Sequence, residues 1–283
     1  MMSSSTTPLV MGVLNVTPDS FSDGGEYLAT EHAVAHALDM IAEGAEIIDV
    51  GPESTRPGSH PVPAEEQIAR AVPVIEGIRA RNNGIAISID TRLAPVAKAA
   101  TEAGADIVND VSALRDDPAM LDCIAAASAG VILMHMWGRP ADMQVGGGPH
   151  YDDVLGEIAY FLEERRRYAA QGGVEPSGII FDPGIGFGKR VEDNLLILQH
   201  LDKLAALGQP LMVGASRKSF IGRVLNIEDP KQRTAPSLAC AAVAVMAGAS
   251  IVRTHEVRAT VETVRICTAI RQARTHVPNT VNS

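Results

Sequence analysis

Four polar residues, widely spaced along the chain, end or closely follow short apolar runs: Asp90, Asn109, Asp182 and Lys218. A carboxylate accepts two parallel hydrogen bonds from an amidine-like N–H/NH₂ edge, an asparagine amide both donates and accepts, and a lysine donates to a carbonyl or a ring nitrogen. Brought together, these groups suit a flat heterocycle with alternating donors and acceptors, such as a pterin or guanine. The alternative for each Asp or Asn taken alone is a helix cap, a position that these residue types favour.

A second set of residues is cationic: Arg56, Arg217, Lys218, Arg253 and His255. The chain carries 24 Lys and Arg against 34 Asp and Glu, a net charge of −10, so a group of cations needs a reason. Because arginine binds phosphate oxygens in pairs, the set favours a phosphate site. The alternative is ordinary ion pairing at the surface, and Arg217 is the candidate for tying one strand to its neighbour.

Eight short apolar runs alternate with longer amphipathic segments over nearly the whole chain. They are Leu9–Leu14, Ile47–Val50, Ala86–Ile89, Ile107–Val108, Val131–Met134, Ile179–Phe181, Leu211–Val213 and Ile251–Val252. None shows the polar alternation of a half-exposed strand, as expected for parallel strands covered on both faces. With 283 residues and no Gly-x-Gly-x-x-Gly after the first run, the pattern predicts an α/β protein with a single (β/α)8 TIM barrel. We expect one domain over residues 9–274, between disordered tails at 1–8 and 275–283.

The segments after the first, second and fifth runs are long, whereas those that lead into the runs are short. Barrels of this kind carry their active sites at the C-terminal ends of the strands, where the polar residues above also fall. Residues 15–25 are rich in turn formers, which predicts a mobile lid. In the glycine-rich segment 184–189, glycines allow the backbone to approach a ligand closely, and Phe187 is placed to cover an aromatic ring.

The composition excludes several classes of partner. An acidic excess without a basic tail argues against nucleic acid and against anionic membranes. The longest apolar run, Leu238–Ala249, is well short of the roughly 20 residues that span a bilayer. The three cysteines are far apart and form no Cys-x-x-Cys, so we expect reduced thiols and a cytoplasmic protein. The histidines lack zinc-ligand spacing.

Beyond these patterns, the chain resembles the dihydropteroate synthase family of bacterial folate biosynthesis, from Val10 to about Arg271. The resemblance is carried by eight segments. They are Met11–Gly25, Glu53–Gly58, Ser88–Thr91, Asn109–Ser112, Met134–Met136, Asp182–Lys189, Gly214–Ser219 and Arg253–Val257. The first, second, sixth and seventh are the most specific.

The resemblance implies a barrel enzyme that joins 6-hydroxymethyl-7,8-dihydropterin diphosphate to 4-aminobenzoate and releases diphosphate and 7,8-dihydropteroate. It implies catalytic roles for Lys218, Asp90, Asp182 and Arg56. By position, the pterin ligands would be Asp90, Asn109, Met134, Asp182 and Lys218. The diphosphate ligands would be Asn15, Thr55, Arg56, Arg253, Thr254 and His255, with Mg²⁺ held at Asn15. The aminobenzoate subsite, where sulfonamides are expected to compete, would be framed by Phe21, Pro57, Phe187, Lys218 and Ser219.

The family is typically a homodimer, and the Ala-rich segments 237–247 and 257–271 are candidates for the contact between subunits; ordinary packing on the barrel is the alternative.

Two other readings use the same residues. A methyltetrahydrofolate-dependent methyltransferase would share the pterin ligands but has no need of Arg56 or of the phosphate-binding set around Arg217 and Lys218. A non-catalytic paralogue that only binds a pterin would be expected to lose loop residues such as Asn15, Thr55 or Arg56, and all three are present.

Overall fold

The computed structural model describes residues 7–17, 25–54, 61–138 and 149–274. Eight strands alternate with helices along these segments. The strands are β1 (Leu9–Asn15), β2 (Ile47–Gly51), β3 (Ala86–Asp90), β4 (Ile107–Asp110), β5 (Gly130–Met134), β6 (Ile179–Asp182), β7 (Met212–Val213) and β8 (Ile251–Thr254). The helices are α1 (Gly25–Ala42), α2 (Ala64–Arg81), α3 (Ala94–Glu102), α4 (Met120–Ala127), α5 (Val154–Gln171), α6 (Val191–Gln199), α7 (Leu201–Ala205), α8 (Ser219–Leu225), α9 (Thr234–Met246) and α10 (Val257–Arg274). The predicted tails lie outside the described residues, apart from Thr7 and Pro8.

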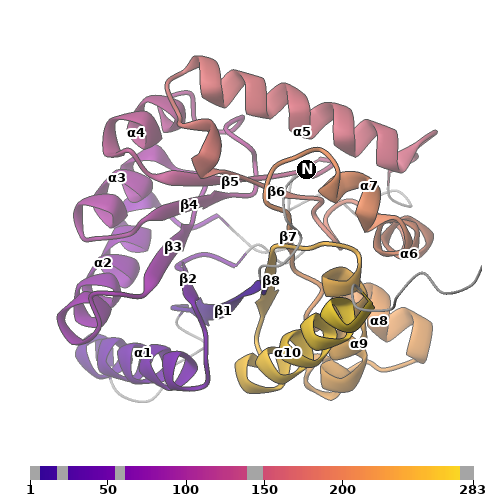
Figure 1. Ribbon diagram of the computed structural model, residues 1–283. Coiled ribbons are helices and arrows are strands. Elements are labelled where there is room, and N and C mark those ends of the chain that lie inside the picture. The colour runs from indigo at the N-terminus through magenta and orange to yellow at the C-terminus, as the bar shows by residue number, and fades with distance from the viewer. Residues whose placement is uncertain (1–6, 18–24, 55–60, 139–148, 275–283) are drawn as a thin grey trace, which may run out of the picture.

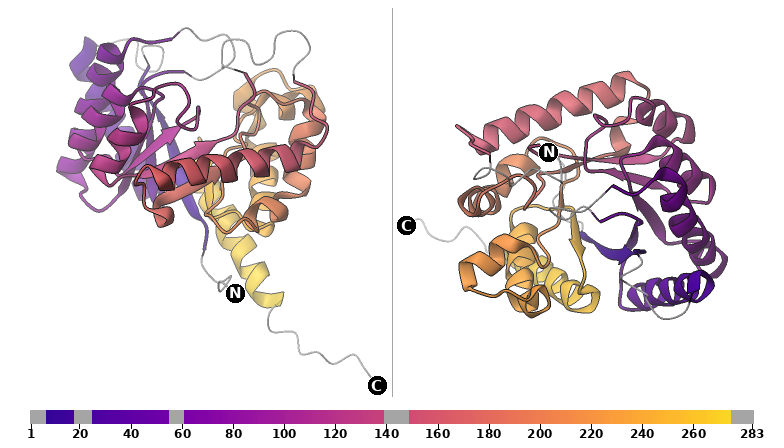
Figure 2. Two further views of the ribbon diagram at one scale, coloured as in Figure 1. Left: turned by 90° about the horizontal axis from the view of Figure 1, so that it is seen from above. Right: turned by 180° about the vertical axis from the view of Figure 1, so that it is seen from behind.

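The strands form one parallel sheet in the order β6-β5-β4-β3-β2-β1-β8-β7. Its two ends meet through a bridge between Phe181 and Leu211, where the amide of Phe181 donates to the carbonyl of Pro210 at 2.9 Å. The helices form a ring around the strands (Figures 1 and 2). The predicted (β/α)8 barrel is therefore confirmed, and all eight apolar runs are strands.

Most strands extend beyond the predicted runs into polar residues. Asp90 and Asn109, for example, are register partners between β3 and β4, so the parallel ladder continues into the residues predicted to bind a ligand. β7 is shorter than predicted, because Leu211 makes only the single bridge to Phe181. The polar side chains thus stand on the regular backbone of strands, which fixes their directions.

The inner face of the barrel explains why these side chains converge. An apolar cluster from six strands, with the partly buried Ala86 and Ile107 against it, fills the interior: Met11, Ile47, Ile132, Ile180, Met212 and Ile251. Because side chains two residues apart on a strand point the same way, the next inward layer follows directly. The next inward side chain after Ile47 on β2 is Asp49, after Ile180 on β6 it is Asp182, and after Ile251 on β8 it is Arg253. A layer of polar side chains therefore lies directly above the apolar cluster inside the barrel, toward the C-terminal ends of the strands.

A second and larger apolar cluster, which includes Ile48, Ile75 and Phe181, packs between the strands and the surrounding helices. Its strand residues, such as Ile48 and Phe181, occupy positions that alternate with the inward ones, and its helix residues, such as Ile75, face the strands. Within the described residues, no helix combines the length and apolar character needed to cross a membrane.

Candidate active site

A cavity of ≈ 320 Å³, including its open mouth, lies at the C-terminal ends of the strands. It is lined by Asp90, Asn109, Val111, Met134, Asp182, Ile185, Phe187, Gly214, Lys218 and Arg253. All five residues predicted to bind a pterin are among them. They come from β3, β4, β5, β6 and the loop after β7, so the barrel brings together groups that are far apart in the chain.

Arg253 lies between two carboxylates in this cavity. Its Nε donates to Asp49 Oδ2 at 2.7 Å, and its Nη2 donates to Asp90 Oδ2 at 3.0 Å. Nη2 also lies 2.6 Å from Asp49 Oδ2 in an ion pair. Burial disfavours the charge of Arg253, but the charges of Asp49 and Asp90 outweigh it and raise the pKa of the guanidinium. Arg253 therefore stays charged among the residues that line the cavity.

Asp49 was not among the predicted site residues. It is fully buried, and its Oδ2 also accepts a hydrogen bond from Asn109 Nδ2 at 3.2 Å. The signal in the sequence is one carboxylate inside the apolar run Ile47–Val50, since a buried charge must be paired.

The two acidic pocket residues are buried, and burial works against their charged forms. Burial, with the negative charge of Asp49 next, raises the pKa of Asp90 to about 7, while Arg253 and Lys218 oppose the rise. Burial also raises the pKa of Asp182, although the amide of Gly184, which donates to Asp182 Oδ1 at 2.7 Å, and the charge of Lys218 hold it back. Such carboxylates gain from a ligand that presents N–H groups or positive charge.

Lys218 and Phe187 form one wall of the cavity. The Nζ of Lys218 lies 3.9 Å from the centre of the Phe187 ring, a cation–π contact. Gly186 allows the chain to pass beside Lys218: it has φ +83°, and a Cβ there would lie 3.1 Å from Lys218 Cδ. The glycine-rich segment thus brings an aromatic face next to the lysine.

The cationic set divides into two parts. The hydroxyl of Ser216 lies 3.0 Å from His255 Nδ1 and accepts the amide N–H of His255 at 3.3 Å, which joins the loop after β7 to the end of β8. Arg217 instead forms an ion pair with Glu256. This ion pair links the loop after β7 to the loop after β8. It favours a structural role for Arg217, which connects neighbouring strands, over a role in binding phosphate.

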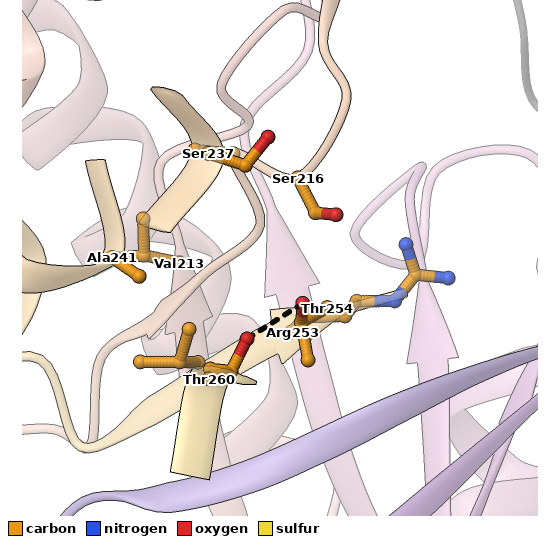
Figure 3. Close-up of a pocket in the computed structure, with 9 residues that line it drawn as sticks. Val213, Ser216, Ser237, Ala241, Arg253, Thr254 and Thr260 are labelled. Carbon is orange, nitrogen blue, oxygen red and sulfur yellow. Dashed lines mark hydrogen bonds between the residues drawn. The ribbon is translucent and has the colours of Figure 1, made fainter. Parts of the chain in front are cut away.

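Thr254 faces away from this cavity. Thr260 and Thr254 share a hydrogen bond of 2.9 Å in a separate small cavity between β7, β8, α9 and α10, whereas Arg253 extends away from Thr260 (Figure 3). The alternation of a strand requires this, since Arg253 and Thr254 are consecutive. The hydroxyl of Thr254 is therefore not brought to the predicted diphosphate ligands.

The other predicted residues surround the mouth or lie outside the described residues. Asn15 ends β1 beside Gly51, where a Cβ would lie 3.5 Å from Asn15 Oδ1. Ser219 is exposed at the start of α8. Four predicted residues lie outside the described part of the chain: Phe21, Thr55, Arg56 and Pro57.

Comparisons with known proteins agree with this geometry. A family model described as pterin binding enzyme matches residues 11–255. The dihydropteroate synthase of Escherichia coli strain K12 is 46% identical over 268 residues, which cover 94% of this chain and 93% of that protein. This chain belongs to the dihydropteroate synthase family.

Solved structures of the dihydropteroate synthase family have the same fold. The Yersinia pestis enzyme, in a sulfonamide drug complex, aligns with a TM-score of 0.88 and 42% identity over 95% of this chain and 96% of that one. The Xanthomonas albilineans enzyme, in complex with 7,8-dihydropteroate, aligns with a TM-score of 0.83 and 42% identity over 98% and 97% of the two chains.

In this member of the dihydropteroate synthase family, a buried lysine beside the pocket was missed from the sequence. The Nζ of Lys189 makes three hydrogen bonds: to His135 Nδ1 at 3.1 Å, to the carbonyl of His135 at 3.2 Å and to the carbonyl of Phe187 at 3.1 Å. Burial, opposed by Asp182, lowers the pKa of Lys189 to about 7. Burial and then the charge of Lys189 lower the pKa of His135 to about 2, so the imidazole is neutral and accepts at Nδ1. Lys189 thus joins the end of β5 to the glycine-rich segment.

A substitution at Gly184 would show how tightly the glycine-rich segment 184–189 packs against the end of β5. Gly184 has φ +68°, and a Cβ there would lie 1.9 Å from the carbonyl oxygen of His135. We expect Gly184→Ala to lower the free energy of unfolding by about 4 kcal/mol, from left-handed strain plus a clash with backbone. Gly208→Ala is the matched control, since Gly208 has φ +89° but nothing within 4 Å, and it should cost only about 1 kcal/mol. Urea unfolding measures both, and equal losses would contradict the clash.

The pKa of Lys189 predicts a pH dependence of stability. Its folded value of about 7 lies below the ordinary 10.5, so between these values the unfolded chain binds one proton more than the folded chain. Stability should therefore rise with pH in that window. The difference in unfolding free energy between wild type and Lys189→Met should grow by about 1 kcal/mol per pH unit from pH 7.5 to 9.5. Lys203→Met, at an exposed position, is the control and should give a flat difference. A flat difference for Lys189→Met as well would show that the ammonium is not buried as described.

Proposed function

We propose that this chain condenses 6-hydroxymethyl-7,8-dihydropterin diphosphate with 4-aminobenzoate to give 7,8-dihydropteroate and diphosphate. The observation that carries the proposal is that all five residues expected to bind the pterin line one cavity. The membership of the family and the E. coli relative, whose printed name is dihydropteroate synthase, support the same reaction.

The pterin ring is proposed to lie in this cavity with its N–H groups on the carboxylates. Asp182 and Asp90 would accept from the amino-pyrimidine part of the ring, Asn109 would both donate and accept, and Lys218 would donate to a ring nitrogen or the carbonyl. Met134 would contact the ring face. The ring becomes positive when the diphosphate leaves, and the two buried carboxylates are placed to stabilise that charge.

The departing diphosphate is proposed to bind at the mouth, on Arg253 and His255, with Thr55 and Arg56 from the second loop. The backbone of residue 254 remains available there, although its hydroxyl bonds Thr260. Cationic groups at this position favour bond breaking because they stabilise the charge on the leaving group.

Mg²⁺ is proposed to accompany the diphosphate, with Asn15 as the protein ligand. Among the described residues, no group of three or more His, Cys, Asp or Glu side chains could hold a metal ion. The single amide oxygen beside Gly51 nevertheless fits Mg²⁺, which keeps several waters and is commonly bound by one or two protein oxygens plus substrate phosphates. When bound, the ion would neutralise charge on the diphosphate.

The amine of 4-aminobenzoate is proposed to attack the pterin methylene from a subsite framed by Phe187, Lys218 and Ser219, with Phe21 and Pro57 from the first two loops. A neutral aniline is already a nucleophile and needs no strong base. Catalysis would then be electrostatic and positional, without a covalent enzyme intermediate. We expect rapid-quench mass spectrometry during turnover to find no pterin attached to the protein, and an adduct would contradict this mechanism.

We also propose a homodimer in the cytoplasm. Large apolar side chains are exposed on α6, α8, α9 and α10, a group of helices joined by mutual contacts: Leu195, Leu196, Val224, Leu225, Val243, Ile266 and Ile270. A second subunit covering them would remove apolar surface from water. All three cysteines are free thiols, which supports a reducing compartment. Light scattering on the purified chain tests the dimer, with a mass of one subunit as the contradicting result.

Turnover tests the proposed function. The chain is incubated with the pterin diphosphate, 4-aminobenzoate and Mg²⁺, and diphosphate and dihydropteroate are measured together. We expect equal amounts of the two products and none when either substrate is omitted. Pterin binding without product would favour a non-catalytic pterin-binding protein, and methyl transfer from methyltetrahydrofolate would favour a methyltransferase.

A further inference from the structure

Asp49 is a buried charge with no role assigned so far. It lies in the middle of β2, in register with Val13 of β1 and Ser88 of β3, and its side chain is fully buried. It does not line the pterin cavity. A carboxylate removed from water in this way costs several kcal/mol unless strong partners compensate, so its partners indicate what the residue is for.

All the hydrogen bonds of the Asp49 side chain within the described residues converge on one oxygen. Oδ2 accepts from Arg253 Nε at 2.7 Å and from Asn109 Nδ2 at 3.2 Å. The same oxygen lies 2.6 Å from Arg253 Nη2 in an ion pair. Oδ1 has no partner among these residues. One atom of Asp49 therefore holds two residues that do line the cavity, from β8 and from β4.

The contact with Asn109 fixes which way its amide faces. Because Nδ2 donates to Asp49, the amide oxygen is turned away from Asp49. That orientation offers an acceptor, in place of a donor, to a ring in the cavity that Asn109 lines. Rotated the other way, the amide oxygen would face a carboxylate, and the two acceptors would repel.

The contact of Asp49 with Arg253 holds the Arg253 guanidinium in a fixed position. With Asp49 and Asp90 as joint acceptors, the guanidinium is held among the residues that line the cavity. The positive charge of Arg253 also stabilises the ionised form of Asp90. It thereby opposes the burial that raises the pKa of Asp90. The Asp49 carboxylate is thus connected to three of the cavity residues: Asn109, Arg253 and, through Arg253, Asp90.

We propose that Asp49 is a positioning residue for pterin recognition, which sets the donor and acceptor order of Asn109 and keeps Arg253 beside Asp90. The proposal rests on the proposed function, since it takes the cavity to be the pterin site. It predicts a selective defect: loss of the Asp49 charge should weaken pterin binding much more than diphosphate binding, because a released Arg253 can still reach the mouth.

The test compares Asp49→Asn with wild type by calorimetry, using 6-hydroxymethylpterin and, separately, diphosphate with Mg²⁺. We expect at least a tenfold loss of pterin affinity and less than a threefold loss for diphosphate. A pterin affinity within threefold of wild type, or equal losses for both ligands, would overturn the proposal. Failure of the wild type to bind the pterin would instead count against the proposed function, so the two failures are distinguishable.

Asp106→Asn is the matched control. Asp106 also pairs with an arginine, Arg79, but before β4 at the opposite end of the barrel. This variant should leave both affinities within threefold of wild type, while unfolding in urea reports any loss of stability in either variant. A parallel loss of pterin affinity in Asp106→Asn would show that a general weakening of the barrel, and not the position of Asp49, causes the defect.

A second measurement leaves Asp49 in place, in case Asp49→Asn does not fold. Asn109→Ala, Arg253→Gln and the double variant are titrated with 6-hydroxymethylpterin. If both residues depend on the same carboxylate, the loss of affinity in the double variant should be smaller than the product of the two single losses. A loss equal to that product would overturn the proposal.

Discussion

Lys218→Ala should lower kcat/KM by about 10²- to 10³-fold, the largest effect expected from one side chain in the site. The Nζ of Lys218 lies over the Phe187 ring, and the residue lines the same cavity as Asp182. Its removal takes away the proposed charge-assisted hydrogen bond to the pterin, about 1.5–3 kcal/mol, and the proposed contact of the ammonium with the aminobenzoate ring, about 1 kcal/mol. At about 1.4 kcal/mol for each factor of ten, these losses give the stated range.

Steady-state kinetics in both substrates measure this effect. Because Lys218 is assigned to the pterin and to the aminobenzoate subsites, KM should rise for both, and a rise for the pterin alone would place Lys218 outside the second subsite. Lys203→Ala is the control, since Lys203 is an exposed lysine on α7, and it should match wild type. If kcat/KM of Lys218→Ala stayed within threefold of wild type, Lys218 would not belong to the site.

Asp182→Asn should weaken pterin binding by about 1.5–3 kcal/mol, or roughly 10- to 150-fold, through loss of a charge-assisted hydrogen bond. The change is nearly isosteric, and the asparagine oxygen still accepts the amide of Gly184 that now donates to Asp182 Oδ1. The loop after β6 should therefore keep its shape, and the effect should come from the charge.

Calorimetry with 6-hydroxymethylpterin measures this effect, with Asp202→Asn on α7 as an exposed control. Diphosphate affinity should change little, because Asp182 is assigned to the ring. Unchanged pterin affinity in Asp182→Asn would mean that the ring does not lie on this carboxylate, and the assignment of the cavity would be wrong.

Much of the site follows from strand positions in the sequence. Asp90, Asn109 and Asp182 end apolar runs, and the carboxyl ends of parallel strands meet at one rim, so their convergence was predictable. The alternation of side chains along a strand also predicts that Arg253 and Thr254 point in opposite directions. The inward direction of Asp49, two residues after Ile47, was accessible in the same way.

Pairings between distant residues were not predictable in this way. Asp49 and Arg253 are separated by 204 positions, and nothing in the local sequence indicates that the Arg253 guanidinium pairs with Asp49 and Asp90. Lys189 follows a glycine-rich segment that favours an exposed loop, yet its ammonium is buried on His135 and Phe187. Which partners a buried charged group pairs with depends on the cost of removing it from water and on the charges that the fold brings near it. The order of residues along the chain does not contain that information.

The proposed function requires the pterin ring to bind in one cavity, on Asp90, Asn109 and Asp182 from three strands and on Lys218 from the loop after β7. A crystal structure of this chain with 6-hydroxymethylpterin tests it most directly. The account predicts the ring in the cavity, with Asp90, Asn109, Asp182 and Lys218 all within hydrogen-bond distance of its polar edge. A ring bound elsewhere, or a ring in the cavity that leaves Asp182 and Asn109 without contact, would contradict it.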